Sequence, residues 1–436
     1  MKLNEIGLPR SRLRKVIADK TDMLFGRLLR HIVKVGSLTV IDADDKTHVI
    51  GGSPGPSVTI RLHDPALHWK LFLNVNLYLG EAYMDGTLTV EDGDIYDFLK
   101  FSMANIEVSG EHPVMDWLSR ADTLFRRFQQ YNPVDRARRN VAHHYDLSGE
   151  LYDLFLDHDR QYSCAYFKHP DDDLELAQRN KKRHLAAKLR LEPDMKVLEI
   201  GSGWGGLALY LAEHTGVHVT GLTLSKEQLA VSTARAKKMG LEDRVSFHLR
   251  DYREQAGTFD RIVSVGMFEH VGVTHYAQYF NAVRQRLTED GIALIHTIGR
   301  SGVPRATNPW IRKYIFPGGY IPALSEVSES IEQTGLITCD VEILRLHYAE
   351  TLRHWRQRFA SNRDKAEQLF DARFCRMWEF YLAASEISFR HMDNVVFQLQ
   401  LAKKNSSVPL TRDYIAEWEH NAEQKHNPSL RRGVGD

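Results

Sequence analysis

The stretch KVLEIGSGWGG, residues 196–206, decides the fold of this chain. Val197–Ile200 is typical of a short buried strand, and glycines follow it at positions 201, 203 and 205. Glycine lets the backbone approach a ligand where a Cβ would clash. The segment LALYLAEH from Leu207 predicts a helix, whose first N–H groups are free to bind polar or anionic atoms. The pattern therefore predicts a strand, a ligand-binding turn and a helix.

Glu199 at the strand end narrows the class of ligand. A carboxylate there would repel the pyrophosphate of a dinucleotide, whereas it suits the ammonium group of S-adenosylmethionine. A plain strand-to-helix turn is the alternative interpretation of the glycines. We predict a cofactor site of the methyltransferase type at Glu199, Gly201, Ser202, Gly203, Trp204 and Gly205.

The C-terminal half alternates predicted strands and helices. Further strands are predicted at 217–224, 244–250, 259–266, 291–298, 336–344 and 394–402, and helices at 174–189 and after Ser225. This alternation predicts an α/β fold, a Rossmann-like methyltransferase domain with a mostly parallel seven-stranded sheet and helices on both faces. Ligands of such sheets bind at the carboxyl ends of the strands.

Polar side chains follow the ends of five predicted strands. They are Glu199, Thr223 with Gln228, Asp251 with Tyr252 and Arg253, Glu269 with His270, and His296 with Thr297. Because carboxyl ends of parallel strands meet at one edge, we expect one crevice. The second strand lacks the acidic residue that usually binds a ribose about 20 residues after the glycines. Thr223 and Gln228 are expected to bind the ribose with neutral hydrogen bonds, and Tyr252 to lie near the adenine.

Composition excludes several classes of protein. The chain has 436 residues, with 57 basic and 57 acidic side chains, so its formal net charge of zero argues against a nucleic-acid binder. Three cysteines without a C-x-x-C spacing predict a reducing compartment and no zinc or other metal site. No apolar run approaches the roughly 20 residues that span a bilayer. We expect a cytoplasmic protein.

The N-terminal part has a different pattern. Residues 36–103 alternate short strands with helical pieces at 65–73, 75–84 and from 94, and the turn GGSPGP at 51–56 separates two of the strands. A small α+β domain is predicted. The basic amphipathic stretch 8–35 and the arginines between 126 and 139 are each interpreted as an ordinary solvated or packed segment, or as a contact with anionic lipid.

Several uncommon motifs occur in one order. They are QYSCAYF (161–167), GSGWGG, GLTLS, RDYR, DRIVSVGMFEHVG, ALIHTIG and NPWIRKYIFPGGYIP (308–322). From about His143 to Ala402 the chain resembles the cyclopropane-fatty-acyl-phospholipid synthases. The resemblance implies a lipid-binding domain similar to sterol carrier proteins at 1–104, a basic helical linker at 105–140, a catalytic domain at 141–404 and a C-terminal tail at 405–436. Glu199 and Ser202 depart from the family, which often has Asp and Cys at these places.

The resemblance also implies an activity. Members add a methylene group from S-adenosylmethionine across a cis double bond of a phospholipid acyl chain, with bound bicarbonate as general base. Carried over by motif, the bicarbonate is held by Cys164, Glu269, His296, the backbone of Ile298, and Tyr348. Since a Glu269 carboxylate would repel the anion, we expect it to accept from the bicarbonate hydroxyl or to orient His296. The implied cofactor contacts are Tyr162, Ser163, the turn Gly201–Gly205, Thr223, Leu224, Gln228, Asp251, Tyr252 and Arg253.

The implied partners are phospholipid acyl chains and the inner membrane surface, where the protein is peripheral, and a second copy in a homodimer. Two alternatives stay open from the sequence. One is a lipid C-methyltransferase that leaves a methyl- or methylene-branched chain. The other is a lipid-binding protein without catalysis.

Overall fold

The computed structural model describes residues 26, 29–109 and 149–426. The chain divides into two compact units. The first unit comprises Met1–Ala121, Asn308–Ile315 and Arg363–Ile387, and the second comprises Asp122–Thr307, Phe316–Asn362 and Ser388–Asp436. Most of the predicted basic N-terminal helix and of the predicted linker lies outside the described residues.

The first unit contains a four-stranded sheet in the order β2-β1-β3-β4. Its elements are β1 Val35–Ile41, β2 Thr47–Gly51, β3 Ser53–Leu62, α2 Leu67–Met84, β4 Leu88–Asp92 and α3 Ile95–Ser109. The two predicted helical pieces are the halves of α2, which is kinked at Asn74. The predicted turn at 51–56 is partly wrong, because β3 already begins at Ser53. Its two prolines lie where the pairing with β1 shifts register, so neither is required to donate to a regular ladder.

Helices from late in the chain complete the first unit. They are α11 Pro309–Tyr314, α14 Arg363–Leu369 and α15 Ala372–His391, of which residues up to Ile387 belong here. Gly80 of α2 admits two aromatic rings, since a Cβ there would lie 2.6 Å from Trp310 and 2.8 Å from Phe380. Lys313 also donates to Glu81 at 2.7 Å. Segments that the sequence places between residues 141 and 404 thus pack on α2.

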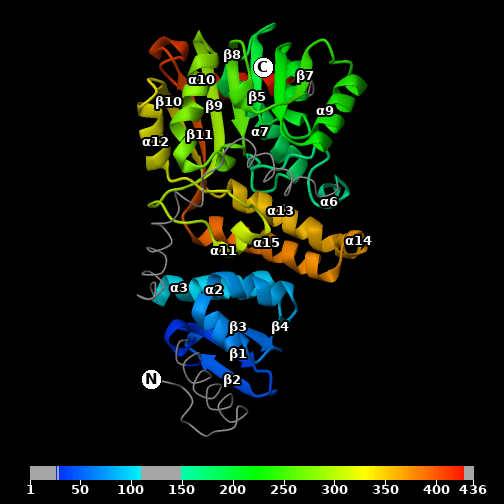
Figure 1. Cartoon of the computed structure of the whole chain (residues 1–436), viewed down its shortest axis with the longest axis vertical. Coiled ribbons are helices and arrows are strands. Elements are labelled where there is room, and N and C mark those ends of the chain that lie inside the picture. Colours follow the sequence, from blue (N-terminus) through cyan, green and yellow to red (C-terminus); the bar gives the residue numbers. More distant parts are fainter. Residues whose placement is uncertain (1–25, 27–28, 110–148, 427–436) are drawn as a thin grey trace, which may run out of the picture. The chain divides into compact units, whose positions relative to one another are not determined.

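The second unit is built on a seven-stranded sheet in the order β10-β11-β9-β8-β5-β6-β7 (Figure 1). The strands are β5 Lys196–Ile200, β6 His218–Thr223, β7 Val245–Leu249, β8 Phe259–Val265, β9 Leu287–Arg300, β10 Ile337–Leu344 and β11 Asn394–Ala402. β11 runs antiparallel to both of its neighbours, and β9, β8, β5, β6 and β7 pair in parallel. The predicted α/β class and the mostly parallel sheet are confirmed.

Helices cover both faces of this sheet (Figure 1). α10 Tyr276–Arg286 and α12 Leu324–Glu332 pack on one face, together with Leu198, Ile295 and Phe397. α7 Leu174–Leu189, α8 Gly206–Thr215 and α9 Lys226–Met239 pack on the other, together with Val197 and Leu294. Successive residues of a strand point to opposite faces of the sheet, so neighbouring residues of one strand belong to different cores.

The remaining elements of the second unit are short or peripheral. They are α6 Gly149–Asp153, η1 Tyr252–Glu254, η2 Phe268–His270, η3 Val273–His275, α13 His347–Ser361, η4 Asn405–Ser407 and α16 Asp413–His426. The segment predicted as a tail therefore contains α16, which packs on α7. Within the described ranges, none of the helices has the length and apolarity needed to cross a bilayer. Cys164, Cys339 and Cys375 are free thiols.

Candidate active site

A pocket opens at the carboxyl ends of the central parallel strands. Its volume is about 1160 Å³, which includes the solvent space at its mouth. All but one of the predicted cofactor residues line it, namely Tyr162, Ser163, Glu199, Gly201, Ser202, Gly203, Trp204, Thr223, Leu224, Gln228, Asp251, Tyr252 and Arg253. The expected convergence is therefore present for the polar residues after the first three strands and for His270 after the fourth, whereas Glu269, His296 and Thr297 do not line this pocket.

The exception is Gly205, which serves the packing of α8. Its φ of +83° is in the left-handed region, where a Cβ is disfavoured. A Cβ at this position would also lie 2.7 Å from the Phe247 ring and 2.8 Å from Ser232. Gly203, by contrast, has φ of +51° and no atom within 4 Å of such a Cβ. Gly205 is thus required by the close approach of α8 and its neighbours.

Glu199 is a buried ionisable group in the wall of the pocket. Its side chain is buried, the nearby backbone N–H of Ala208 acts to lower its pKa, and Oε2 has no hydrogen-bond partner in the described part of the chain. Burial raises the pKa of this carboxyl to about 8. A buried carboxyl without a partner is costly unless a ligand satisfies it. Its position in the pocket fits a ligand that carries a positive charge.

The residues predicted to bind the nucleoside are already linked to one another. The Thr223 hydroxyl donates to Gln228 Oε1 at 2.8 Å. Asp251 accepts two bonds from the Arg253 guanidinium, each of 2.8 Å, so its charge is balanced locally. These contacts fix the side chains that line this end of the pocket before any ligand enters.

Sequence reasoning missed Lys181, which lies behind the pocket wall. This α7 lysine is fully buried, and its Nζ donates to Gln161 Oε1 at 2.7 Å and to Ser163 Oγ at 2.8 Å. Burial lowers its pKa to about 8. Its ammonium also influences the pKa values of Glu199 and His296. The signal in the sequence was a lysine on the buried face of α7. Because this helix has few apolar residues, its buried face is hard to recognise from the sequence.

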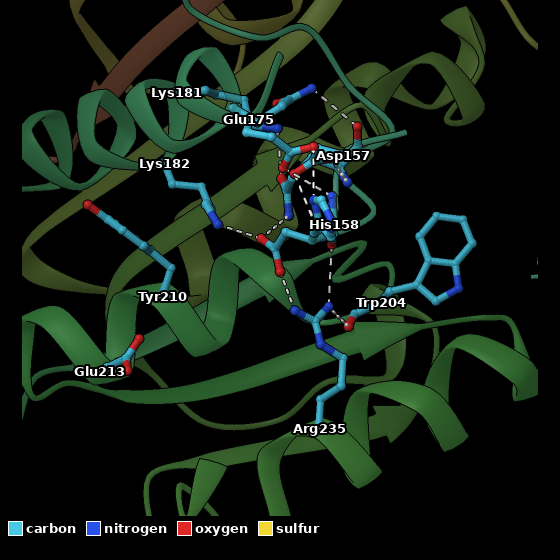
Figure 2. A network of polar contacts seen from close by, with 12 residues as sticks. Asp157, His158, Glu175, Lys181, Lys182, Trp204, Tyr210, Glu213 and Arg235 are labelled. Carbon is cyan, nitrogen blue, oxygen red and sulfur yellow. Dashed lines mark hydrogen bonds and ion pairs between the residues drawn. The ribbon is translucent and has the colours of Figure 1, made fainter. Parts of the chain in front are cut away.

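Figure 2 shows a polar network that braces the glycine turn. Lys182 and Arg235 both bind the carboxylate of Asp159, with the Lys182 nitrogen 2.5 Å from Oδ2. Arg235 also donates to the carbonyl oxygen of Trp204 at 2.9 Å. A Cβ on Gly206 would lie 2.4 Å from Asp159. The segment before Tyr162 and the glycine turn are therefore held together by the same charges.

The predicted bicarbonate residues lie outside the lining of this pocket. Two of them, Glu269 on η2 and Ile298 on β9, are connected by a hydrogen bond. Glu269 Oε1 accepts from the backbone N–H of Ile298 at 2.6 Å, and Oε2 lacks a partner among the described residues. Burial raises the pKa of Glu269 to about 7. His296 is buried two residues earlier on β9, and its Nδ1 lies 3.2 Å from Gln398 Nε2. The Gly266 N–H, at the pocket wall, donates to the carbonyl oxygen of His296 at 2.9 Å.

Two expectations for this set differ from the structure. Glu269 does not orient His296, because Glu269 binds Ile298 and the ring of His296 pairs with Gln398. The Ile298 N–H, expected to donate to the anion, is already donated to Glu269. The reason is tertiary, since η2 brings the carboxylate over the end of β9 and a buried N–H takes the nearest acceptor.

Cys164 and Tyr348 are linked through α13. Cys164 is buried, and burial raises the pKa of its thiol. The amide N–H of the next residue donates to Thr351 Oγ1 at 3.0 Å, one helical turn from Tyr348. The ring of Tyr348 meets the indole of Trp355 edge-on, with their ring centroids 5.8 Å apart. The pocket residue Tyr162 stacks on the same indole, with a centroid distance of 5.2 Å. Pocket and α13 thus share an aromatic core.

Other pocket residues were not assigned a contact with the cofactor. Arg160, Gln161 and His270 also line the pocket, and burial lowers the pKa of His270 to about 4. Gln161 and His270 lie inside the motifs QYSCAYF and DRIVSVGMFEHVG, and Arg160 directly precedes the first of them, so the motifs themselves were the available signal. His270 follows the fourth predicted strand and was expected at this crevice, where the structure places it.

Comparison with known proteins agrees with this architecture. Residues 133–399 match the model of the mycolic acid cyclopropane synthetase family. The chain is 39% identical over 378 residues to a probable fatty acid methyltransferase of Pseudomonas putida, which covers 83% of this chain and 92% of that protein. It is 38% identical over 344 residues to the cyclopropane-fatty-acyl-phospholipid synthase of Escherichia coli K12, which covers 79% and 87%.

A solved structure extends the likeness to three dimensions. Mycolic acid cyclopropane synthase CmaA1, complexed with SAH and CTAB, aligns with a TM-score of 0.58 at 32% identity, over 62% of this chain and 98% of that one. The residues that match the family model, 133–399, include both the glycine turn and Glu269 with His296. By the match to the family model and by these relatives, the chain belongs to the mycolic acid cyclopropane synthetase family, an S-adenosylmethionine-dependent group that includes the synthases its motifs resemble.

Proposed function

We propose that this protein transfers a methylene group from S-adenosylmethionine to the cis double bond of an unsaturated phospholipid acyl chain, forming a cyclopropane ring. The observation that carries the proposal is the arrangement at the strand ends. A pocket with a buried carboxyl, Glu199, whose Oε2 has no hydrogen-bond partner among the described residues, adjoins the strand that carries His296 and Ile298. The E. coli relative, named for this activity, supports the choice of substrate.

The pocket residues fit S-adenosylmethionine by charge and by backbone shape. Glu199 Oε2 supplies an acceptor for a cationic group, and Gly203 leaves open space where a side chain would stand. The paired Thr223 and Gln228 offer neutral groups to ribose hydroxyls, and Tyr252 offers a ring face to the adenine. An alkene is a weak nucleophile, so the pocket's contribution is to hold the methyl donor in line and to exclude water.

The residues proposed to hold bicarbonate, Glu269 among them, can donate hydrogen bonds to a small anion. Bicarbonate, when bound, would supply the general base that removes a proton from the transferred methyl group. With a pKa near 7, Glu269 carries a proton on part of the molecules, and its Oε2 then donates to an anion instead of repelling it. His296, Tyr348 and Cys164 are the other donors proposed to hold the anion. Ile298 contributes by fixing Glu269 through Oε1.

The first unit is proposed to meet the lipid surface with the start of α2. Trp69 and Phe72 are each 39% exposed with rings 6.2 Å apart, and Leu73 is 61% exposed. Aromatic side chains beside a lysine, here Lys70, suit the boundary between lipid headgroups and acyl chains. A peripheral protein at the inner membrane surface, acting as a homodimer, completes the proposal. Sedimentation velocity of the purified protein tests the dimer.

Vesicle binding tests the lipid surface. The double variant Trp69→Ser/Phe72→Ser is expected to sediment less with vesicles of anionic phospholipid carrying cis-unsaturated chains. Its turnover of detergent-dispersed phospholipid should stay unchanged. The matched control is Val49→Ser, which removes an apolar side chain that is 69% exposed on β2. Equal loss of vesicle binding in both proteins would contradict the assignment of α2.

Lipid analysis tests the reaction itself. The chain is expressed in a bacterial host that makes no cyclopropane lipids, and phospholipid acyl chains are analysed by mass spectrometry. A gain of one methylene group with loss of alkene reactivity is expected. A methyl- or methylene-branched product would instead support the second candidate, which the Pseudomonas putida relative's name favours. Binding of phospholipid without any incorporation of labelled methyl carbon would reject both enzymatic functions.

A further inference from the structure

A buried polar layer lies between α7 and the sheet, next to the proposed base site. Ile295, Phe397 and Leu399 belong to the core under α10, so the residues that follow Ile295 and Phe397 point to the α7 face, as Leu294 does. Those residues are His296 and Gln398, which are 2% and 0% exposed. They face each other directly, since Gln398 is the register partner of His296 across β9 and β11.

A chain of hydrogen bonds runs through this layer to a charged end. The carboxylate of Glu342 on β10 accepts from Lys188, a fully buried lysine of α7. Lys188 Nζ donates to Gln398 Oε1 at 2.8 Å. Gln398 Nε2 then lies 3.2 Å from His296 Nδ1.

The direction of each bond in this chain follows from chemistry. An ammonium group only donates, so the oxygen of the Gln398 amide must face Lys188. The amide nitrogen, which only donates, is left to face His296. The ring nitrogen Nδ1 must therefore accept, because a proton there would set two donors against each other. A neutral ring with an unprotonated Nδ1 carries its proton on Nε2.

The surroundings keep the ring neutral. Burial, together with Lys181, Lys188 and His184 of α7, holds the pKa of His296 well below its usual range, and Glu342 on β10 opposes them only in part. These are the charged groups that act on the ring from the elements packed against it. His296 thus keeps one N–H, on Nε2, across the working pH range.

We propose that Lys188 and Gln398 are positioning residues that hold His296 as its Nε2–H tautomer, so that this ring donates a hydrogen bond to the anion of the proposed reaction. The proposal rests on the proposed function for the identity of the anion. The tautomer follows from the bonds alone. The residues touch neither substrate nor cofactor and act through the imidazole.

Nuclear magnetic resonance of the full-length protein, labelled with ¹⁵N-histidine, measures the tautomer. A His296→Asn variant identifies the signals of this ring. In the wild-type protein we expect an unprotonated Nδ1 and a protonated Nε2. In Gln398→Glu the new carboxylate accepts a proton, so Nδ1 becomes protonated. The matched control is Gln400→Glu, the same change two residues along β11, at a buried amide that binds the Lys188 carbonyl and Tyr414 at 2.7 Å each. It should leave the ring as in the wild type.

The pH profile of turnover gives a second readout. In Gln398→Glu the carboxylate raises the pKa of the ring, so at low pH both nitrogens carry protons and Nε2–H is kept. As the pH rises through that pKa, the proton leaves Nε2 because Nδ1–H is held by the carboxylate. We expect kcat to fall by about 10²-fold across this step, the usual effect of losing one oriented donor, with the KM for S-adenosylmethionine unchanged. Wild type and Gln400→Glu should show no such step.

Two results would overturn the inference. One is a wild-type ring protonated on Nδ1, which needs no variant to be stable. The other is a Gln398→Glu ring whose Nδ1 stays unprotonated. Neither depends on turnover, so a failure of the proposed reaction, seen as absence of cyclopropane lipid, is distinguishable from a failure of this assignment.

Discussion

Replacing Glu199 by glutamine is expected to abolish a proton release that accompanies the binding of S-adenosylmethionine. Burial raises the pKa of Glu199 to about 8, so at pH 7 roughly nine-tenths of the molecules carry the proton. The sulfonium and ammonium charges of the ligand favour the carboxylate, which lowers that pKa in the complex. The proton then leaves as the ligand enters.

The magnitude follows from linkage. Because the pKa of the free protein lies above that of the complex, affinity rises with pH below about 8 and levels off above it. The dissociation constant should fall by close to tenfold for each pH unit in that range, and about 0.9 proton should be released per site at pH 7. Lys181, with a pKa of about 8, adds its own release, which differs between wild type and variant only through its electrostatic interaction with Glu199.

Isothermal titration calorimetry in two buffers of different ionisation enthalpy counts the protons. The difference between the wild type and Glu199→Gln isolates the carboxyl. Glu213→Gln is the control, because this α8 carboxylate is 53% exposed and lies outside the pocket lining. If Glu199→Gln released as many protons as the wild type, with the same dependence of affinity on pH, the assignment of Glu199 to the cationic ligand would be refuted.

Three further outcomes are expected. Lys181→Met should raise the dissociation constant for S-adenosylmethionine about tenfold by calorimetry, since it leaves the acceptors Gln161 Oε1 and Ser163 Oγ at the pocket wall without their charged donor; an unchanged constant would contradict this. Glu269→Gln or Tyr348→Phe should lower kcat strongly in a labelled-methyl assay while cofactor affinity stays within about twofold, and a loss confined to affinity would contradict the proposed roles. Gly205→Ala should lower the free energy of unfolding by about 2–3 kcal/mol in denaturant melts, because its Cβ would lie 2.7 Å from a ring carbon, whereas Gly203→Ala, with open space, should cost about 1 kcal/mol; equal losses would show that the contact is relieved.

Much of the second unit could be predicted from local pattern. The helix at 174–189 and the strand at 394–402 have the predicted bounds, and the other strands of the sheet differ by a few residues. Ser225 caps α9 by accepting from the Gln228 N–H, as its capping spacing indicates. The pocket could be predicted as well, because parallel strands bring their carboxyl ends to one edge, and the polar residues that follow them are visible in the sequence.

The partnerships inside the site could not be predicted this way. Glu269 binds Ile298, and His296 pairs with Gln398, which lies 102 residues further along the chain. Gly205, predicted to serve the ligand, serves helix packing.

The sequence by itself determined the sheet, the glycine turn and the family, because these depend on periodicity and on short motifs whose geometry is set within a few residues. Only the tertiary structure decided which buried groups form hydrogen bonds with each other. It also decided that α11 packs on α2. The physical reason is that strand register and helix burial join residues distant in the chain. A buried donor or acceptor binds whatever partner that packing brings within reach.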